Sequence, residues 1–291
     1  MRLSSHSSDA CTDATGASWR VRDVMALMES WYPAAWAQSW DRVGLIVGDP
    51  DAPVRSLLLA LDPTAAIAEQ AMAGPSGDGN SYDMVITHHP LLLRGASFLP
   101  VTDPKGRVVT TLIRSGIALF NAHTNADVAC DGVATALADL IGLRDTVPLE
   151  PCGTDTEGRE IGLGRVGSVA ETTLGSFADH VASVLPAGPS GLFVGGDEAM
   201  PVRRVAVLGG AGDSALESAR AAGVDVYLTA DLRHHPASEH LEGGAPALLC
   251  GSHWATESPW LPVLARKLRD AASAADVELR VEVSTIVTEP W

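Results

Sequence analysis

The chain has 291 residues, of which 46% are hydrophobic and 19% charged, enough to build one large domain or two smaller ones. Its formal net charge of −16 and its pI of about 4.8 argue against nucleic acid and anionic membranes as partners, because a phosphate surface would be repelled. The charge does not exclude a small nucleotide, whose pocket can carry its own local field.

The N-terminal segment is rich in Ser, Thr and Asp and has no apolar stretch of the length that a signal peptide needs. We expect residues 1–18 to form a flexible tail. The four cysteines form no CxxC pair and fit no zinc ribbon, so we expect reduced thiols. Because no run of about 18 apolar residues occurs, we expect a cytoplasmic protein that does not enter a membrane.

Apolar spacing and turn residues predict that helices and strands alternate along the first half of the chain. Val21, Val24 and Met28, for example, share one face of a helix. We expect helices over 20–31, 64–73, 107–115 and 132–141, and strands over 56–61, 83–87 and 117–121.

The second half repeats this alternation, which is typical of mainly parallel sheets flanked by helices. We therefore predict an α/β fold of two lobes, 19–145 and 146–291, with C-terminal elements completing the functional site. The connection over 145–160 has the composition of a linker. We expect helices over 174–184, 214–222 and 260–275, and extended segments over 160–169, 202–208, 225–229, 247–250 and 277–283.

Two segments resemble each other. Residues 82–90 read YDMVITHHP and residues 225–236 read DVYLTADLRHHP. In each, an Asp precedes a strand that contains or ends in Thr, and a His-His-Pro comes after it. Either chance or two related lobes would explain this repeat.

Histidines and carboxylates follow three of the predicted strands. Open α/β sheets bind ligands beyond the carboxyl ends of their strands, so three such clusters indicate one shared site. The clusters are His88-His89, His123 with Asp127, and His253 with Glu257.

Imidazole and carboxylate ligands suit zinc, iron, manganese or nickel. Because neighbouring side chains on extended backbone point in opposite directions, His88 and His89 would not chelate one ion, but each could serve a separate ion if the chain turns at Pro90. Two ions in such sites lie roughly 3.5–4 Å apart and share a bridging carboxylate. Taken singly, each cluster could instead be a hydrogen-bonded structural histidine, an Asx turn or a helix start.

His253 and Glu257 are four residues apart, which would place them on one face of a helix. Pro259 argues against a regular helix through Glu257. We expect the helix to begin with Ser258 as its N-cap and Pro259 in its first position, so that the pair lies on the preceding turn.

Four other histidines have less specific surroundings. His234 and His235 are either a polar loop edge or residues that line the site. His180 and His240 lie in predicted helices and are expected at the surface.

A glycine-rich loop covers residues 209–214 between a strand and a helix. It lacks the Lys-Ser/Thr of a P-loop and the spacing of the dinucleotide fingerprint. A tight turn with Asp213 as N-cap is the simpler interpretation, and a phosphate site is the alternative. Asp41 is a possible polar lining residue.

Several motifs together resemble the Nif-three-like family, whose members are also labelled GTP cyclohydrolase I type 2 homologs. ITHHPLL together with HTN-x-D is the most specific combination. The resemblance spans about residues 20–291 and includes WDRVGLIVG (40–48), ITHHPLL (86–92), HTNADVACDG (123–132), GGAG (209–212), DVYLT (225–229) and HWATE (253–257).

The resemblance implies two α/β lobes, a dinuclear metal centre and a homohexamer. By this resemblance, His89 and Asp127 would bind one metal ion. His88 and His253 would bind the other, and Glu257 would bridge the two ions. His123 would lie near the metals without binding them. Apart from the resemblance, either His123 or His235 could carry protons.

The chain departs from the family pattern at three positions. Arg42 stands where the family often has Asn, and Ala230 replaces a frequent Gly. Ser252 separates Gly251 from His253, which often follow each other directly. None of these changes removes an expected ligand.

This interpretation leads to two candidate functions. The first is a metal-dependent hydrolase acting on a nucleotide or on a phosphorylated or cyclic metabolite, with Glu257 and His123 as catalytic residues. The second is a protein without catalytic activity that handles metal or acts as a regulator.

Overall fold

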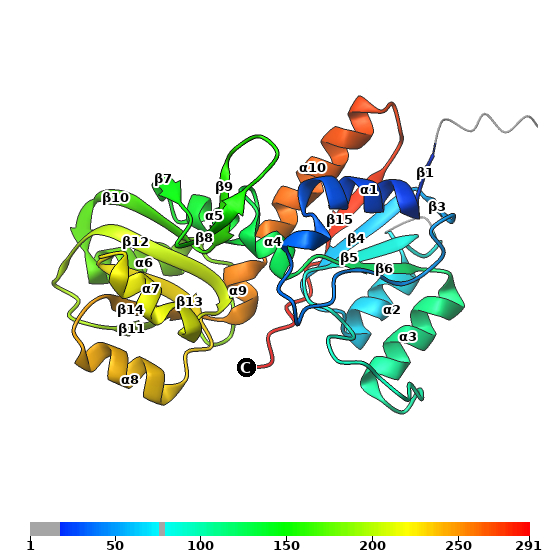
Figure 1. Cartoon of the computed structure of the whole chain (residues 1–291). Helices are drawn as coiled ribbons and strands as arrows, with labels where there is room; N and C mark the ends of the chain where they lie inside the picture. The colour runs from blue at the N-terminus through cyan, green and yellow to red at the C-terminus, as the bar shows by residue number, and fades with distance from the viewer. Residues whose placement is uncertain (1–17, 76–78) are drawn as a thin grey trace, which may run out of the picture.

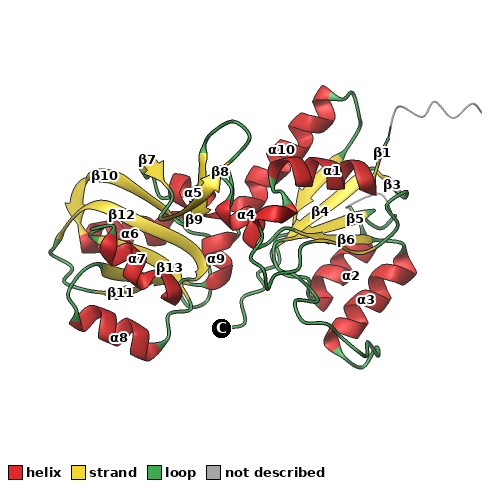
Figure 2. Cartoon of the chain, in the orientation of Figure 1, coloured by secondary structure: helices red, strands yellow, loops and turns green. Residues whose placement is uncertain are grey.

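The computed structural model describes residues 18–75 and 79–291, which fold into two α/β lobes (Figure 1). The tail expected at the N-terminus lies, up to residue 17, outside the described residues. The predicted α/β class is confirmed, since helices surround a central sheet in each lobe (Figure 2). No helix in the described part of the chain has the length and apolar character needed to cross a bilayer.

The first lobe contains a five-stranded sheet in the order β15-β4-β5-β6-β2. The first four of these strands are parallel and β2 is antiparallel to β6. The strands are β2 (Gly44–Val47), β4 (Ser56–Ala60), β5 (Met84–Thr87), β6 (Ala118–Asn121) and β15 (Arg280–Val283). A two-stranded ribbon of β1 (Trp19–Arg20) and β3 (Pro53–Val54) lies beside it.

Helices cover both faces of this sheet, so β4 is buried along its whole length. Leu57 and Leu59 face one layer of helices and Leu58 the other, as the two-residue repeat of a strand requires. α1 (Val21–Trp31) and α10 (Trp260–Ala274) form the first layer, and α2 (Ala65–Ala73) and α3 (Pro104–Ser115) the second. The 3-10 turn η1 (Ala34–Trp36) follows α1.

The second lobe contains a six-stranded sheet in the order β11-β14-β13-β12-β10-β7, in which β12, β13 and β14 are parallel. β8 and β9 pair separately. The strands are β7 (Arg144–Val147), β8 (Glu150–Thr154), β9 (Glu160–Leu163), β10 (Arg165–Thr173), β11 (Phe193–Gly195), β12 (Pro201–Ala211), β13 (Val226–Ala230) and β14 (Ala247–Gly251).

The helices of the second lobe also form two layers. α5 and α6 share one apolar cluster, and α7 and α8 share the other. Two five-residue helices, α4 and α9, lie between the lobes (Figure 1). The bounds are α4 (Thr124–Val128), α5 (Val133–Leu140), α6 (Leu174–Val184), η2 (Asp213–Ala215), α7 (Leu216–Ala221), α8 (His234–Glu242) and α9 (His253–Glu257).

Local sequence signals explain where many of these elements begin and end. The carboxylate of Asp103 accepts the backbone N–H groups of Lys105 and Gly106, at 2.9 and 3.2 Å, and thereby caps α3. Pro104 occupies its first position, and Gly116 ends it with a φ of +68°. These contacts satisfy backbone groups that a helix end would otherwise leave unpaired.

The chain passes between the lobes in both directions. β7 joins the second sheet directly after α5, whereas β15, from the C-terminal region, pairs with β4 in the first sheet. A boundary between the lobes near residue 145 stays a prediction; the pairing shows that the first sheet is completed by residues 280–283.

Candidate metal centre

The histidines of interest lie just beyond the carboxyl ends of three strands. β5 ends at Thr87 and is followed by His88 and His89; His123 lies two residues after β6, and His253 two residues after β14. The Thr87 hydroxyl donates a hydrogen bond to the His89 carbonyl oxygen at 2.8 Å, which closes the turn there. The sheets thus bring four histidines to the junction between the lobes.

His253 and Glu257 lie on a helix, which corrects the expectation of a turn. α9 runs from His253 to Glu257, and the Ser252 hydroxyl caps it by accepting a backbone N–H group. Ser258 is the C-cap of α9, and α10 begins only after Pro259. Pro259 is compatible with this turn because no hydrogen bond of α9 requires its missing N–H. The four-residue spacing therefore does place both side chains on one face.

The first group of converging ligand atoms consists of His89, His253 and Glu257. One oxygen of Glu257, Oε2, lies 3.0 Å from His89 Nε2 and 3.1 Å from His253 Nε2. The two Nε2 atoms are 3.2 Å apart. Nitrogen atoms this close must share a proton or a cation, because two lone pairs or two N–H groups would repel each other.

The second group is built around His88. His88 Nε2 lies 3.6 Å from Asp127 Oδ1 and 3.7 Å from Glu257 Oε1, the other oxygen of the same carboxylate. The geometry therefore groups His88 with Asp127, and His89 with His253. The family resemblance implied His89 with Asp127 and His88 with His253, and the assignment of ligands to each ion stays a prediction. Glu257 lies between the two groups in both arrangements.

His123 faces the same centre. Its ring centroid is 5.1 Å from that of His88, and a nitrogen of each ring, together with one of His89, falls in a single candidate cluster. Its Nδ1 atom lies 3.0 Å from Asp41, whose other oxygen accepts the Thr124 N–H at 3.1 Å. Burial raises the pKa of Asp41, but these hydrogen bonds outweigh it and hold the pKa well below its usual value. Asp41 therefore orients His123.

Each of the four histidines is held through Nδ1 by a hydrogen-bond acceptor. This fixes the ring and directs Nε2 into the centre, as is typical of histidines that bind metal ions. The pairs are His88 with the carbonyl oxygen of Ala122 (2.9 Å), His89 with Asp62 (2.6 Å), His123 with Asp41 (3.0 Å) and His253 with Asp231 (2.8 Å).

Sequence reasoning missed two of these acceptors, Asp62 and Asp231. A signal was present, because Asp62 follows β4 by two residues and Asp231 directly follows β13, so both lie at the carboxyl ends of parallel strands. Asp62 belongs to no motif with histidine, and Asp231 shares a segment with His234 and His235 rather than with its partner His253. The two partners are 27 and 22 residues away in sequence. Only the strand order shows that they meet.

The first ligand group has strongly displaced pKa values. Burial opposes the protonated form of His89, but Glu257 and Asp62 outweigh it and raise the pKa to about 10. The pKa of His253 is raised to about 9, again against burial, by Glu257 and Asp231. Burial alone would raise the pKa of Glu257, but the neighbouring histidines hold it well below its usual value. This pocket therefore attracts positive charge.

Asp127 shows the opposite behaviour. Burial and the nearby charge of Glu257 raise its pKa to about 7, although His123 and His89 oppose this. Two carboxylates that interact in this way repel each other unless positive charge lies between them.

An unpaired buried atom tests whether these residues fit a metal centre. His88 Nε2 is buried and has no hydrogen-bond partner, whereas the buried Glu257 Oε2 faces the Nε2 atoms of His89 and His253. Leaving an atom such as His88 Nε2 unsatisfied costs about 1–3 kcal/mol, so it normally has a ligand. Because Nδ1 of His88 donates to a carbonyl oxygen, its Nε2 carries the lone pair that a cation needs. The nitrogen and oxygen donors present thus fit divalent metal ions.

The glycine-rich loop makes room for Glu257. A Cβ atom on Gly210 would lie 2.1 Å from Glu257 Oε1 and 3.0 Å from His253 Nε2, and Gly210 has a φ of +72°. The expected N-cap role of Asp213 is wrong: Asp213 begins η2, α7 has no side-chain cap, and Asp213 pairs with Arg233 instead.

The remaining histidines lie elsewhere. His234 and His235 are exposed in the first turn of α8, where their rings contact each other with centroids 5.2 Å apart. The expectation that His240 lies at the surface is wrong. Its ring is buried, with Nε2 3.0 Å from the Pro246 carbonyl oxygen and Nδ1 3.1 Å from Arg220, because α8 packs that face on the sheet.

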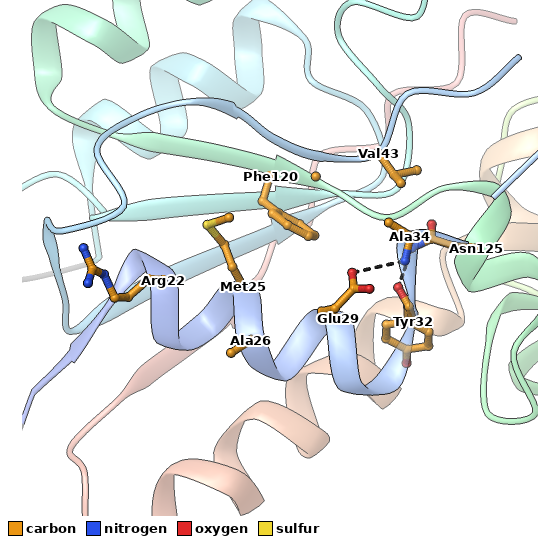
Figure 3. A pocket seen from close by; sticks show the side chains of 10 residues that line it. Arg22, Met25, Ala26, Glu29, Tyr32, Ala34, Val43, Phe120 and Asn125 are labelled. Carbon is orange, nitrogen blue, oxygen red and sulfur yellow. Dashed lines mark hydrogen bonds between the residues drawn. The ribbon is translucent and has the colours of Figure 1, made fainter. Parts of the chain in front are cut away.

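A cavity of about 330 Å³ lies beside α1, away from these ligand groups (Figure 3). Met25 and Phe120 give it an apolar wall, and Glu29 accepts the Ala34 N–H at 3.1 Å. Asn125 connects this region to the centre: its amide donates to the Tyr32 carbonyl oxygen at 2.7 Å and its oxygen accepts the backbone N–H of His123. Asn125 thus links the end of α1 to the His123 turn.

Fold and site together define a two-lobed α/β protein with a histidine–carboxylate cluster between its lobes. The chain belongs to the Duf34/NIF3 (NGG1p interacting factor 3) family, whose sequence profile matches residues 19–290. The family expected from the sequence motifs is thereby confirmed.

Relatives from several bacteria agree with this placement. A Streptomyces coelicolor protein named GTP cyclohydrolase 1 type 2 homolog is 45% identical over 273 residues, covering 94% of this chain and 93% of its own. The structure of a Staphylococcus aureus hypothetical protein matches with a TM-score of 0.84 and 27% identity, over 94% of this chain and 99% of its own. A Bacillus cereus protein related to NIF3 shares the fold, with a TM-score of 0.87 at 24% identity, over 95% and 99% of the two chains.

Proposed function

We propose that this protein binds two divalent metal ions between its lobes. His89 and His253 hold one ion, His88 and Asp127 hold the other, and the carboxylate of Glu257 is shared by both. The observation that carries the proposal is Glu257 itself: it is 4% exposed, and its two oxygens face different ligand groups. Such a buried carboxylate is costly unless positive charge surrounds it.

Zinc, iron, manganese and nickel all accept this mixture of imidazole and carboxylate ligands, and the supply in the cell decides between them. Binding must displace protons, because the pKa values of His89 and His253 are about 10 and 9 in the metal-free site. Metal affinity should therefore rise with pH until the pH passes these pKa values.

We infer that the loaded centre catalyses hydrolysis of a nucleotide or of a phosphorylated or cyclic metabolite. Bound divalent ions lower the pKa of water and stabilise negative charge that develops on oxygen. The chain itself supplies a proton carrier: His123 is 16% exposed, its Nδ1 is held by the ionised Asp41, and its Nε2 is left to accept or release a proton. The name of the Streptomyces relative refers to GTP, which makes GTP one substrate to test.

A second function, metal handling without catalysis, is favoured by a separate observation. The side chains of Asp62 and Asp231 are 28% and 48% exposed and lie directly outside the first ligand group. They present negative charge where an arriving cation would approach.

Elemental analysis of protein purified under mild conditions tests the metal proposal, which requires about two ions per chain. Turnover of GTP and of a phosphoester panel by the loaded protein, compared with Glu257→Ala, then separates the two functions. Two bound ions without turnover above that control would leave metal handling as the function. A metal content near zero, with no uptake when divalent metal ions are added, would contradict both the hydrolase and the metal-handling function.

Assembly is a further part of the proposal. The family resemblance implies a homohexamer, and light scattering coupled to size exclusion measures the mass directly. A cytoplasmic location remains an expectation from the sequence.

A further inference from the structure

A cavity of about 290 Å³ opens beside the first ligand group. His89 and His253 line it together with Asp62 and Asp231, which hydrogen-bond to their rings. Trp254 and the C-terminal residues 288–291 also line it. A small molecule bound here would therefore contact the candidate metal ligands directly.

Two hydrogen bonds hold the C-terminal segment against the centre. The Thr288 hydroxyl donates to Asp62 Oδ2, the second oxygen of the carboxylate that orients His89. The backbone N–H of Trp254 donates to Glu289 Oε2 at 3.1 Å. The segment is thus fixed at both lobes, and it brings the exposed ring of Trp291 to the cavity.

The charge of the cavity is negative. Its lining includes the carboxylates of Asp62, Asp231 and Glu289, and no Lys or Arg occurs among the described residues that form it. Together with Asp127 and Glu257, these five carboxylates exceed the charge of two divalent ions. A polyphosphate would meet a repulsive field here even with both ions bound.

The remaining surface is aromatic and apolar, from Leu61, Trp254, Pro290 and Trp291. Indole rings bind flat heterocycles by stacking, and carboxylates accept hydrogen bonds from amino and ring N–H groups. The two properties together select a flat ring that carries hydrogen-bond donors.

We propose that this cavity is the substrate subsite and that it takes an uncharged or protonated planar heterocycle with N–H donors and no phosphate. The inference rests on the proposed hydrolase function. Among the substrates proposed there, it favours cyclic metabolites without phosphate over nucleotides and phosphorylated metabolites. Trp254 and Trp291 bind the ring, and Glu289 contributes to the exclusion of anions.

An adjoining cavity of about 320 Å³ defines the competing arrangement. Asp62 and His89 line both cavities, and this one also includes Lys105, which is exposed. A phosphorylated ligand would have to extend past the Asp62 carboxylate to reach that amine.

Binding of matched ligands tests the proposal. Metal-loaded full-length protein is titrated with guanosine and adenosine, and with GTP and ATP, while tryptophan fluorescence is followed. The nucleosides should bind at least about tenfold more tightly than the triphosphates at low ionic strength, and added salt should narrow the gap because it screens the repulsion. Metal content is measured before and after, because triphosphates chelate divalent ions.

Variants locate the effect. Glu289→Gln should strengthen triphosphate binding about two- to threefold without changing metal content, whereas Glu278→Gln, at an exposed position remote from the cavity lining, should change nothing. Trp291→Ala should weaken nucleoside binding about tenfold by removing a stacking partner.

Two outcomes would overturn the inference while two metal ions remain bound. One is that the triphosphates bind more tightly than the nucleosides and that Lys105→Gln abolishes this preference, which would place phosphates in the adjoining cavity. The other is failure of both nucleosides to bind. Protein that takes up no metal would instead refute the proposed function, so the two failures are distinguishable.

Discussion

The two lobes share one plan but contribute differently to the centre. Each lobe contains a set of three parallel strands next to one antiparallel edge strand. In the first lobe β2 pairs with the set β4-β5-β6, and in the second lobe β11 pairs with the set β12-β13-β14. The middle strand follows an aspartate in both. Asp83 Oδ2 accepts two backbone N–H groups that begin β4, and Asp225 Oδ2 accepts two from β12, all at 2.8 Å.

The repeat continues beyond the strands. β6 and β14 each lead into a five-residue helix, a longer helix and a strand. In both cases the longer helix and the strand that follows it cross to the other lobe (Figure 1). α5 and β7 pack in the second lobe, and α10 and β15 pack in the first. Each apolar core thus contains a helix from the opposite half of the chain.

The lobes differ in the side chains that they carry beyond the strand ends. The first lobe supplies His88, His89 and Asp127, whereas α9 of the second lobe supplies His253 and Glu257. The similarity between residues 82–90 and 225–236 is therefore real for the aspartate and the strand but not for the histidine pairs, since His234 and His235 begin α8. A shared framework fixes the positions of the side chains, and the residues placed there decide the chemistry.

Replacing the residue shared by both ligand groups should have the largest effect. Glu257→Gln removes the negative charge next to His89, His88 and His253, so both ions should be lost, with an affinity at least about 100-fold lower, more than changes to outer partners cause. Elemental analysis after dialysis measures this, with the exposed Glu278→Gln as the control. Retention of both ions would show that Glu257 does not join the groups.

Removing one ligand from either lobe should affect one ion. Asp127→Ala leaves the group of His89 and His253 intact, and His253→Ala leaves His88 with Asp127. Each variant should keep about one ion per chain, and Co²⁺ titrations should give different absorption spectra because the remaining ligands differ. Loss of both ions in either variant would contradict the two groups that the geometry defines.

The sequence predicted most of this fold because its signals are local. Periodic apolar residues placed α1 and α6 almost to the residue, and strand ends followed by histidine pointed to the centre. Long-range pairing has no such signal. The pairing of β15 with β4 joins segments more than 200 residues apart, and α9 is too short for periodicity to reveal, since tertiary packing stabilises it. The partners of Asp62 and Asp231 depend on the same strand order.

Asp62 and Asp231, which orient the rings of His89 and His253, allow the two lobes to be compared by their contribution to metal affinity. Asp62→Asn and Asp231→Asn each weaken the hydrogen bond to a histidine Nδ1, which should lower metal affinity about 10- to 100-fold. The effect of Asp62→Asn should be larger, because its side chain is 28% exposed against 48% for Asp231. Competition with a chelator measures both affinities, and an equal or reversed order would mean that burial does not control this contribution.

The smallest difference between the lobes is expected for the two aspartates of the shared framework, Asp83 and Asp225, in the free energy of unfolding. Asp83→Ala and Asp225→Ala each leave two backbone N–H groups without their carboxylate, so each should lower the free energy of unfolding by about 2 kcal/mol. Asp83 also accepts the Ser56 hydroxyl at 3.0 Å, so its replacement should cost slightly more. Because each core contains a helix from the opposite half, both variants should shift one common transition in denaturant titrations of metal-free protein. Two separate transitions, each sensitive to only one of the variants, would show that the lobes unfold independently despite the exchanged helices.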